Sequence, residues 1–228
     1  MIIIVIIILL LCYINKTKTE KDKIKYYDFG NKNSDKKICI LAGVHGNEPA
    51  GCHLLINLLK KNYFNKFNLY IRVIPVVNEF GIKYNIRYQN NLLYPDINRN
   101  FREDGGIENI SKQLVDLTKK FNIIIDFHEA WGYYKDNNGS IGSTISTNMT
   151  KLGNIIIDKL NRSINDKRKQ FIQYNKLCRI KTSFGCFNKN KKYMLVETSG
   201  QNNIQPLKLR MKQIYIIIKI ILENINII

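Results

Sequence analysis

The sequence predicts an α/β protein, a three-layer sandwich in which helices cover both faces of a central mixed, mostly parallel sheet. Short apolar runs bounded by glycine or polar residues alternate along the chain with segments of helical spacing, which is the pattern of this class. The length of 228 residues suits one domain with a sizeable core. A hydrophobic content of 45% excludes a disordered chain.

The predicted elements follow one another in this alternating order. Strands are expected where short apolar runs occur, at 37–44, 69–77, 122–128 and 192–200. Helices are expected where apolar residues recur with helical spacing, at 49–62, 110–121, 149–164 and about 206–228. Residues 78–104 are rich in Asn, Tyr and Arg and lack periodicity, so this stretch is predicted to be a long functional loop.

The first 14 residues carry no charge and differ from the rest of the chain. As a helix they would span about 21 Å, which is short of the roughly 30 Å hydrocarbon core of a bilayer. Lysines follow this segment and none precedes it, so the positive-inside rule places the following domain in the cytoplasm. We expect residues 1–14 to form a marginal membrane anchor, residues 15–36 a basic linker and residues 37–228 a single domain. The alternative is a buried or dispensable strand in a cytoplasmic protein.

The net charge limits the classes of binding partner, and the cysteine content limits the metal sites and disulfides that the chain can form. The net charge of +18 favours acidic partners such as nucleic acid, an anionic membrane surface or small carboxylates. Because no nucleic-acid-binding motif accompanies the charge, no nucleic-acid partner is expected. The five cysteines contain no CxxC pair, which excludes a metal knuckle. A Cys178–Cys186 bridge is possible, but reduced, buried thiols are the expectation.

Polar residues with ligand chemistry lie where the predicted strands end. His45 and Glu48, in LAGVHGNEPAG, follow the first strand, His128 ends the third and Glu197 ends the last. Strand ends are where sites collect in open α/β sheets. Two imidazoles with one carboxylate form a zinc-binding set that leaves a fourth position for water, as in catalytic sites.

Four motifs, GVHGNEPAG, DINRNF, DFHEAW and VETSG, together resemble the succinylglutamate desuccinylase/aspartoacylase family of the zinc carboxypeptidase superfamily. They occur in the family's order and span most of residues 37–200. The resemblance implies a zinc carboxypeptidase-like fold and one zinc ion per chain. It also implies that His45, Glu48 and His128 are the zinc ligands.

The same resemblance assigns four further roles. Glu197 is expected to be the general base, and Asn98 and Arg99 to bind the carboxylate of the substrate. Arg87, in a more irregular loop, is expected to polarise the scissile carbonyl. These roles agree with the chemistry of amide hydrolysis. Zinc lowers the pKa of a bound water, and a nearby carboxylate can accept the proton of that water and pass it on. One guanidinium group can stabilise the oxyanion, and another can pair with a substrate carboxylate.

The motifs predict a zinc-dependent amidohydrolase that cleaves the amide bond of a small anionic N-acyl amino acid. One alternative is a zinc carboxypeptidase acting on peptides or peptidoglycan fragments, and a second is a non-catalytic, membrane-tethered basic binding protein. Nothing after Pro206 predicts the family's C-terminal β-rich domain, so the pocket is expected to be more open.

Overall fold

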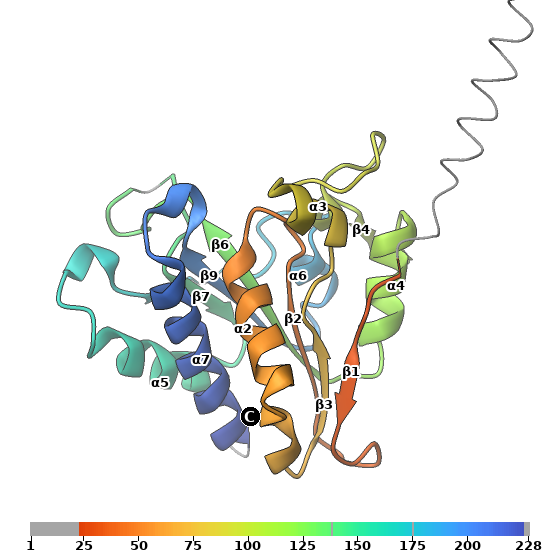
Figure 1. Cartoon of the computed structure of the whole chain (residues 1–228), viewed down its shortest axis with the longest axis horizontal. Coiled ribbons are helices and arrows are strands. Elements are labelled where there is room, and N and C mark those ends of the chain that lie inside the picture. The colour runs from red at the N-terminus through yellow and green to blue at the C-terminus, as the bar shows by residue number, and fades with distance from the viewer. Residues whose placement is uncertain (1–22, 138, 175, 226–228) are drawn as a thin grey trace, which may run out of the picture.

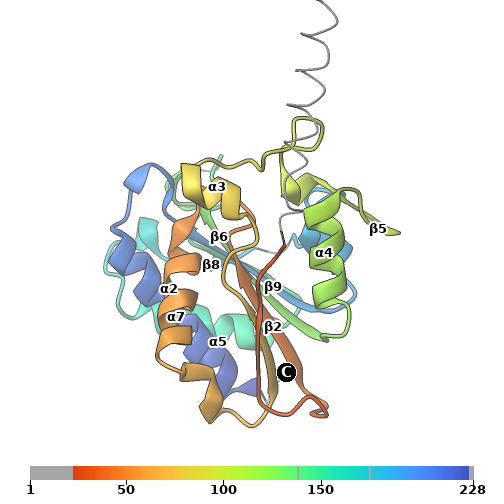
Figure 2. The same cartoon turned by 45° about the vertical axis from the view of Figure 1, so that its right-hand side comes forward.

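The computed structural model describes residues 23–137, 139–174 and 176–225. A twisted seven-stranded sheet runs through the centre of the molecule, and helices cover both of its faces (Figure 1). Turning the molecule shows the two helical layers on opposite sides of the sheet (Figure 2). The predicted α/β sandwich is therefore confirmed.

The sheet is mixed and mostly parallel, as predicted. Its strands lie in the order β1-β3-β2-β6-β9-β7-β8. Their bounds are β1 Tyr27–Phe29, β3 Tyr70–Ile74, β2 Lys37–Ala42, β6 Ile123–Ala130, β9 Lys192–Ser199, β7 Thr144–Thr147 and β8 Ile172–Gln173. The four central strands, β3, β2, β6 and β9, are mutually parallel, whereas β1 and β7 run antiparallel to their inner neighbours. A separate two-stranded ribbon pairs β4 Phe101–Arg102 with β5 Gly105–Gly106.

Helices form the outer layers. One face carries α2 Pro49–Lys60, α5 Thr150–Asn161 and α7 Leu207–Glu223, and the other carries α4 Asn109–Thr118 and α6 Phe184–Phe187. Each layer encloses its own hydrophobic core. Along β6, Ile125 and Phe127 point into the first core and Ile124 into the second, because successive strand residues face opposite sides. The interior strands are apolar on both faces for this reason.

The connecting segments are short helices and loops. The helix α3 spans Glu79–Tyr84, and single 3₁₀ turns occupy η1 Tyr63–Lys66, η2 Ile97–Arg99, η3 Lys167–Lys169 and η4 Gln201–Asn203. The predicted functional loop over 78–104 thus contains α3, η2 and the short strand β4, joined by irregular segments. The strands β7 and β8 were not predicted, because their short, polar sequences carry no hydrophobic alternation.

Two expectations need correction. Part of the predicted basic linker, Tyr27–Phe29, forms β1 and pairs with β3. Arg72 of β3 donates a hydrogen bond to Asp28 of β1. The expected reduced state of the later cysteines is wrong, since Cys178 and Cys186 form a disulfide with Cα atoms 4.3 Å apart. Cys39 and Cys52 are buried and free, as expected.

The predicted membrane anchor, residues 1–14, lies outside the described residues. Among the residues that the structure does describe, no helix has the length and apolar character needed to cross a bilayer.

The strand order determines where a site can form. From β2 the chain crosses through α2 to β3 on one side, and then through α4 to β6 on the other side of β2. The helices on the two sides diverge, which leaves a crevice at the carboxyl ends of β2 and β6. His45 follows β2, and His128 lies near the end of β6.

We predict that Asp28→Asn lowers the free energy of unfolding by about 1–3 kcal/mol, because it breaks a two-pronged pair with a buried arginine. Arg72 Nε and Nη2 each donate to Asp28 at 2.7 Å. Burial raises the pKa of Asp28, but the hydrogen bonds from Arg72 and Tyr70 outweigh it and lower the pKa overall. The stabilisation is therefore complete above about pH 4 and disappears as the pH falls through the depressed pKa.

Urea unfolding of both proteins between pH 3 and pH 7 measures this difference. The matched control is Asp116→Asn, which removes an exposed pair with Lys119 and should change stability by less than about 0.5 kcal/mol. If the difference in unfolding free energy between the wild-type protein and Asp28→Asn grew as the pH fell, the prediction would be contradicted.

Candidate metal and active site

The turn after β2 has a backbone that only glycine can supply. Gly43 has a φ of +73°, in the left-handed region that favours glycine. Gly46 packs against the backbone of α3 so closely that a Cβ atom there would lie 1.9 Å from the carbonyl carbon of Gly81. The glycines of the GVHG motif thus bend the chain back over the strand end, and His45 projects from the bend into the crevice.

Glu48 stands at the start of α2, yet its side chain does not cap the helix. Pro49 occupies the first helical position, where no backbone donor is needed. The first turn is instead stabilised by Glu129, whose carboxylate accepts a 2.6 Å hydrogen bond from the backbone nitrogen of Ala50. Glu48 is therefore free to turn towards the histidines.

Strand alternation separates the side chains at the end of β6. His128 and Asp126 face the crevice, and Glu129 faces α2 and α7, where it pairs with the buried Arg210. The side chain of Glu129 therefore points away from the ligand cluster.

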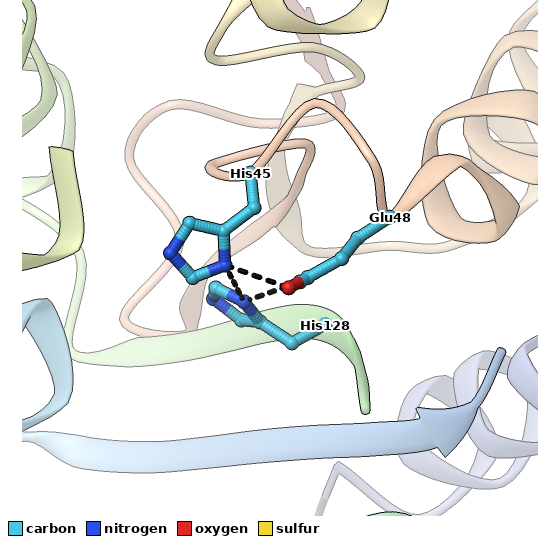
Figure 3. Close-up of side chains that lie close together, drawn as sticks. All are labelled: His45, Glu48 and His128. Carbon is cyan, nitrogen blue, oxygen red and sulfur yellow. Dashed lines mark hydrogen bonds and ion pairs between the residues drawn. The ribbon is translucent and has the colours of Figure 1, made fainter. Parts of the chain in front are cut away.

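The structure brings the three predicted ligands together (Figure 3). Glu48 lies 2.8 Å from Nδ1 of His45 through one oxygen and 2.8 Å from Nδ1 of His128 through the other. The two Nδ1 atoms are 3.1 Å apart. All three side chains are buried, with exposures of 2–3%. Groups that are 80 residues apart in the chain thus present their ligand atoms to one point.

Each histidine has a second carboxylate beside its other ring nitrogen. Nε2 of His45 lies 3.2 Å from Asp96, and Nε2 of His128 lies 3.2 Å from Asp126 in an ion-pair contact. Asp126 is held in turn by a 2.6 Å hydrogen bond from the hydroxyl of Tyr193. Metal-binding histidines usually have such outer carboxylates, which fix the tautomer and leave the inner nitrogen free for the metal.

The outer carboxylates and one amide were not predicted from the sequence. Asp126 shares a strand face with His128 at i and i+2, and this spacing could have identified it. Asp96, just before η2, and Gln201, at the start of η4, lie outside the strands and gave no such spacing signal. Gln201 donates to Glu48 at 3.0 Å, and the backbone nitrogen of Glu129 donates to its second oxygen at 3.1 Å.

The electrostatics of the cluster favour a cation between its members. Burial raises the pKa of Glu48, but the two imidazoles outweigh it and hold the pKa well below its usual range. Burial lowers the pKa of His128, but Asp126 and Glu48 outweigh it and raise the pKa well above its usual value. The pocket therefore stabilises positive charge at the point where the ligand atoms meet.

The residues fit a divalent metal. Four-coordinate zinc takes histidine nitrogens and carboxylate oxygens at about 2.0–2.2 Å, so in a tetrahedron its ligand atoms lie roughly 3.3–3.6 Å from one another. The 2.8–3.1 Å separations at the cluster require only a small expansion to admit the ion. The donor set, two imidazoles with one carboxylate, also suits zinc.

Two predicted catalytic residues adjoin this cluster. Glu197 is directly opposite His128 in the β6–β9 register and faces the same side of the sheet. It is buried, and burial raises its pKa to about 8. Arg87 reaches the cluster from the irregular loop, with Nη1 3.4 Å from Glu48 and Nε 3.1 Å from Asp96.

The predicted carboxylate-binding residues lie on another wall of the same cavity, which has a volume of about 530 Å³. Asn98 and Arg99 belong to η2, and Nη1 of Arg99 donates to the Asn98 carbonyl at 2.8 Å. Further lining residues are the aromatic Trp131 and Tyr174 and the cationic Lys176 and Arg179, together with Leu177 and Ile180. All seven predicted site residues therefore surround or adjoin one cavity.

Comparison with models of protein families matches residues 34–132 to the catalytic domain of the succinylglutamate desuccinylase/aspartoacylase family. This range contains all the predicted site residues except Glu197, which follows on β9. The predicted resemblance is confirmed. The matched model is that of a catalytic domain, which agrees with the expectation of a hydrolase that acts on amide bonds. The chain has no match among curated proteins.

Solved structures share the fold. The tripeptide-bound cell shape determinant Csd4 of Helicobacter pylori superposes with a TM-score of 0.71 at 20% identity, over 90% of this chain and 56% of Csd4. The mDAP-bound form of Csd4, a D,L-carboxypeptidase, gives 0.70 at 20% identity, over 89% and 55%. A candidate metallopeptidase from Shewanella baltica gives 0.64 at 17% identity, over 90% and 83%. The chain spans about half the length of Csd4.

We predict one tightly bound zinc ion per chain in the wild-type protein and its loss in His128→Ala, because two remaining ligands hold zinc weakly. His53, the third histidine, is exposed on α2 and supplies the matched control. Metal analysis of the purified proteins after dialysis checks this. Equal zinc content in His128→Ala and His53→Ala would place the metal elsewhere.

We also predict that Asp126→Asn weakens zinc binding about 10–100-fold, because the neutral amide no longer fixes the His128 ring as a carboxylate does. Competition with a chromogenic chelator measures the affinity. The control is Asp116→Asn on the surface of α4, which should match the wild-type protein. Unchanged affinity in a folded Asp126→Asn protein would remove Asp126 from the metal site.

Proposed function

We propose that the protein is a zinc-dependent hydrolase that cleaves an amide bond whose nitrogen belongs to an amino acid with a free carboxylate. The observation that carries this proposal is the convergence of His45, Glu48 and His128 beside Glu197 at one cavity. A zinc ion held there supplies a Lewis acid that makes water reactive at neutral pH.

The other residues of the cavity provide the remaining steps. Arg99, with the amide of Asn98, pairs with the carboxylate of the substrate and holds its amide bond in the crevice. Arg87 donates to the carbonyl oxygen as negative charge develops on it. Glu197, buried opposite His128, accepts the proton of the attacking water and returns it to the leaving amine.

The peptide-cleaving form of this reaction has the stronger support. Csd4 is a D,L-carboxypeptidase whose solved structures include tripeptide-bound and mDAP-bound forms, and its fold matches most of this chain. The cavity here, about 530 Å³ with aromatic and apolar walls, falls in the usual size range for small-ligand sites. We therefore propose short peptides with a free carboxyl end as the principal substrates, including peptidoglycan fragments.

Deacylation of an N-acyl amino acid remains the second candidate, supported by the match to the succinylglutamate desuccinylase/aspartoacylase catalytic domain. The two reactions cleave the same kind of bond, because each releases an amino acid whose carboxylate stays attached. They differ only in what lies on the acyl side, which is a peptide in one case and a small acid in the other.

A substrate panel separates these candidates. The zinc-loaded protein is incubated with short peptides, peptidoglycan tripeptides and N-acyl amino acids, and products are identified by mass spectrometry. Release of a single C-terminal residue supports the carboxypeptidase, and release of a small acid supports the deacylase. Fully zinc-loaded protein that hydrolyses neither class would overturn the proposal, and salt-dependent binding to anionic vesicles would then favour the basic binding protein.

We predict that Glu197→Gln lowers kcat about 10²–10⁴-fold, because the amide cannot relay a proton. Zinc content should be unchanged, since Glu197 is separate from the ligand cluster. Steady-state kinetics on the best substrate, with Glu103→Gln in the exposed hairpin as control, measures the effect. Retention of wild-type kcat in Glu197→Gln would exclude this residue as the general base.

A further inference from the structure

A disulfide-closed loop forms part of the cavity wall. Cys178 and Cys186 are bonded across a separation of eight residues. Cys178 is exposed, so a reductant can reach the bond, whereas Cys186 is buried. Between the cysteines, Arg179, Ile180, Ser183 and Gly185 line the cavity. The loop 178–186 therefore shapes the space available to a substrate.

The loop also holds the carboxylate-binding segment in place. The backbone nitrogen of Phe184 donates to Oδ1 of Asn98 at 2.8 Å, and the backbone nitrogen of Phe101 donates to the carbonyl of Thr182 at 3.1 Å. The rings of Phe101 and Phe184 are 5.0 Å apart in the second core. Residues 98–101 are thus attached to the loop at both ends.

The hydrogen bond to Asn98 determines which end of its amide faces the substrate. Because Oδ1 accepts from the Phe184 backbone, the Nδ2 amino group is the remaining end of this cavity-lining amide, and a carboxylate requires a donor of this kind. The orientation of Asn98 therefore depends on the position of Phe184, at the start of the four-residue helix α6.

The loop has little regular structure to maintain this position without a cross-link. The helix α6 is a single turn, which is not stable by itself in water. Its local bonds come from two side chains: Ser183 accepts from the backbone nitrogen of Cys186 and donates to the Ile180 carbonyl, and Asn188 donates to the Phe184 carbonyl. Closing the loop with a covalent bond restricts the conformations that compete with the one holding Asn98.

We propose that the Cys178–Cys186 disulfide is a positioning element for the carboxylate subsite, and that its reduction weakens substrate binding while metal binding and the chemical step persist. This inference rests on the proposed function. The metal ligands lie on the β2 turn, α2 and β6, and none of them belongs to the loop. Since disulfides persist only in oxidising surroundings, the protein would bind its substrate more tightly there.

The kinetic test compares the wild-type protein with the double variant Cys178→Ser/Cys186→Ser, each with and without a phosphine reductant. Reduction of the wild-type protein should raise KM about tenfold, the factor expected for loss of one hydrogen bond to a charged group. The kcat should stay within twofold and the zinc content unchanged. The double variant should show the high KM under both conditions.

The Asn98→Ala background tests whether the effect passes through Asn98. Its KM should already be high, and reduction should add little, because coupled residues are not additive. An equal rise of KM on reduction in both backgrounds would overturn the proposal. An unchanged KM in the reduced wild-type protein, a fall in kcat at constant KM, or loss of zinc would do the same.

Hydrogen exchange gives a readout that does not depend on finding a substrate. On reduction, the amide protons of Phe184 and Phe101 should lose protection about tenfold or more, whereas that of Ile125 in β6 should not change. Unaltered protection of Phe184 and Phe101 would overturn the positioning role even if amide hydrolysis is observed. Loss of protection without hydrolysis of any substrate would support the positioning role and contradict only the proposed function.

Discussion

A buried carboxylate between two imidazoles is the constraint on which the rest of the site depends. Glu48 has almost no contact with water, and two ring nitrogens face it and each other at about hydrogen-bond distance. Such a group is costly to bury unless positive charge compensates it. The outer carboxylates Asp96 and Asp126 increase the need for positive charge, and a cation shared by the three ligands would supply it. The order of the strands opens a crevice at the carboxyl ends of β2 and β6. The glycine turn after β2 and the end of β6 border this crevice and place the ligands in it.

The central sheet could be predicted from the sequence because its strands are covered on both faces. β2 is apolar from Ile38 to Ala42 and β6 begins with three isoleucines, and such apolar runs are typical of strands buried on both faces of a sheet. The edge strands lack this signal. β1 lies in a lysine-rich segment and joins the sheet through the distant pairing of Asp28 with Arg72. The spacing of Cys178 and Cys186 likewise left their bond open, because it closes a loop with almost no regular structure.

The site was predictable to the extent that its residues occur in compact motifs. The resemblance supplied His45, Glu48 and His128, and strand ends placed them at one edge of the sheet. Asp126 follows from strand alternation alone. By contrast, Asp96 reaches His45 and Gln201 reaches Glu48 from irregular segments, whose paths depend on contacts made only in the folded protein. The hydrogen bond from the Phe184 backbone to Asn98 likewise depends on contacts made only in the folded protein.

The most direct measurement of the central claim is anomalous X-ray scattering at the zinc absorption edge from crystals of the zinc-loaded protein. The predicted result is one strong peak about 2.0–2.2 Å from Nδ1 of His45, Nδ1 of His128 and a carboxylate oxygen of Glu48, with the outer nitrogens still facing Asp96 and Asp126. A zinc peak ligated by other residues, or no peak in a protein with the three side chains in this arrangement, would contradict it.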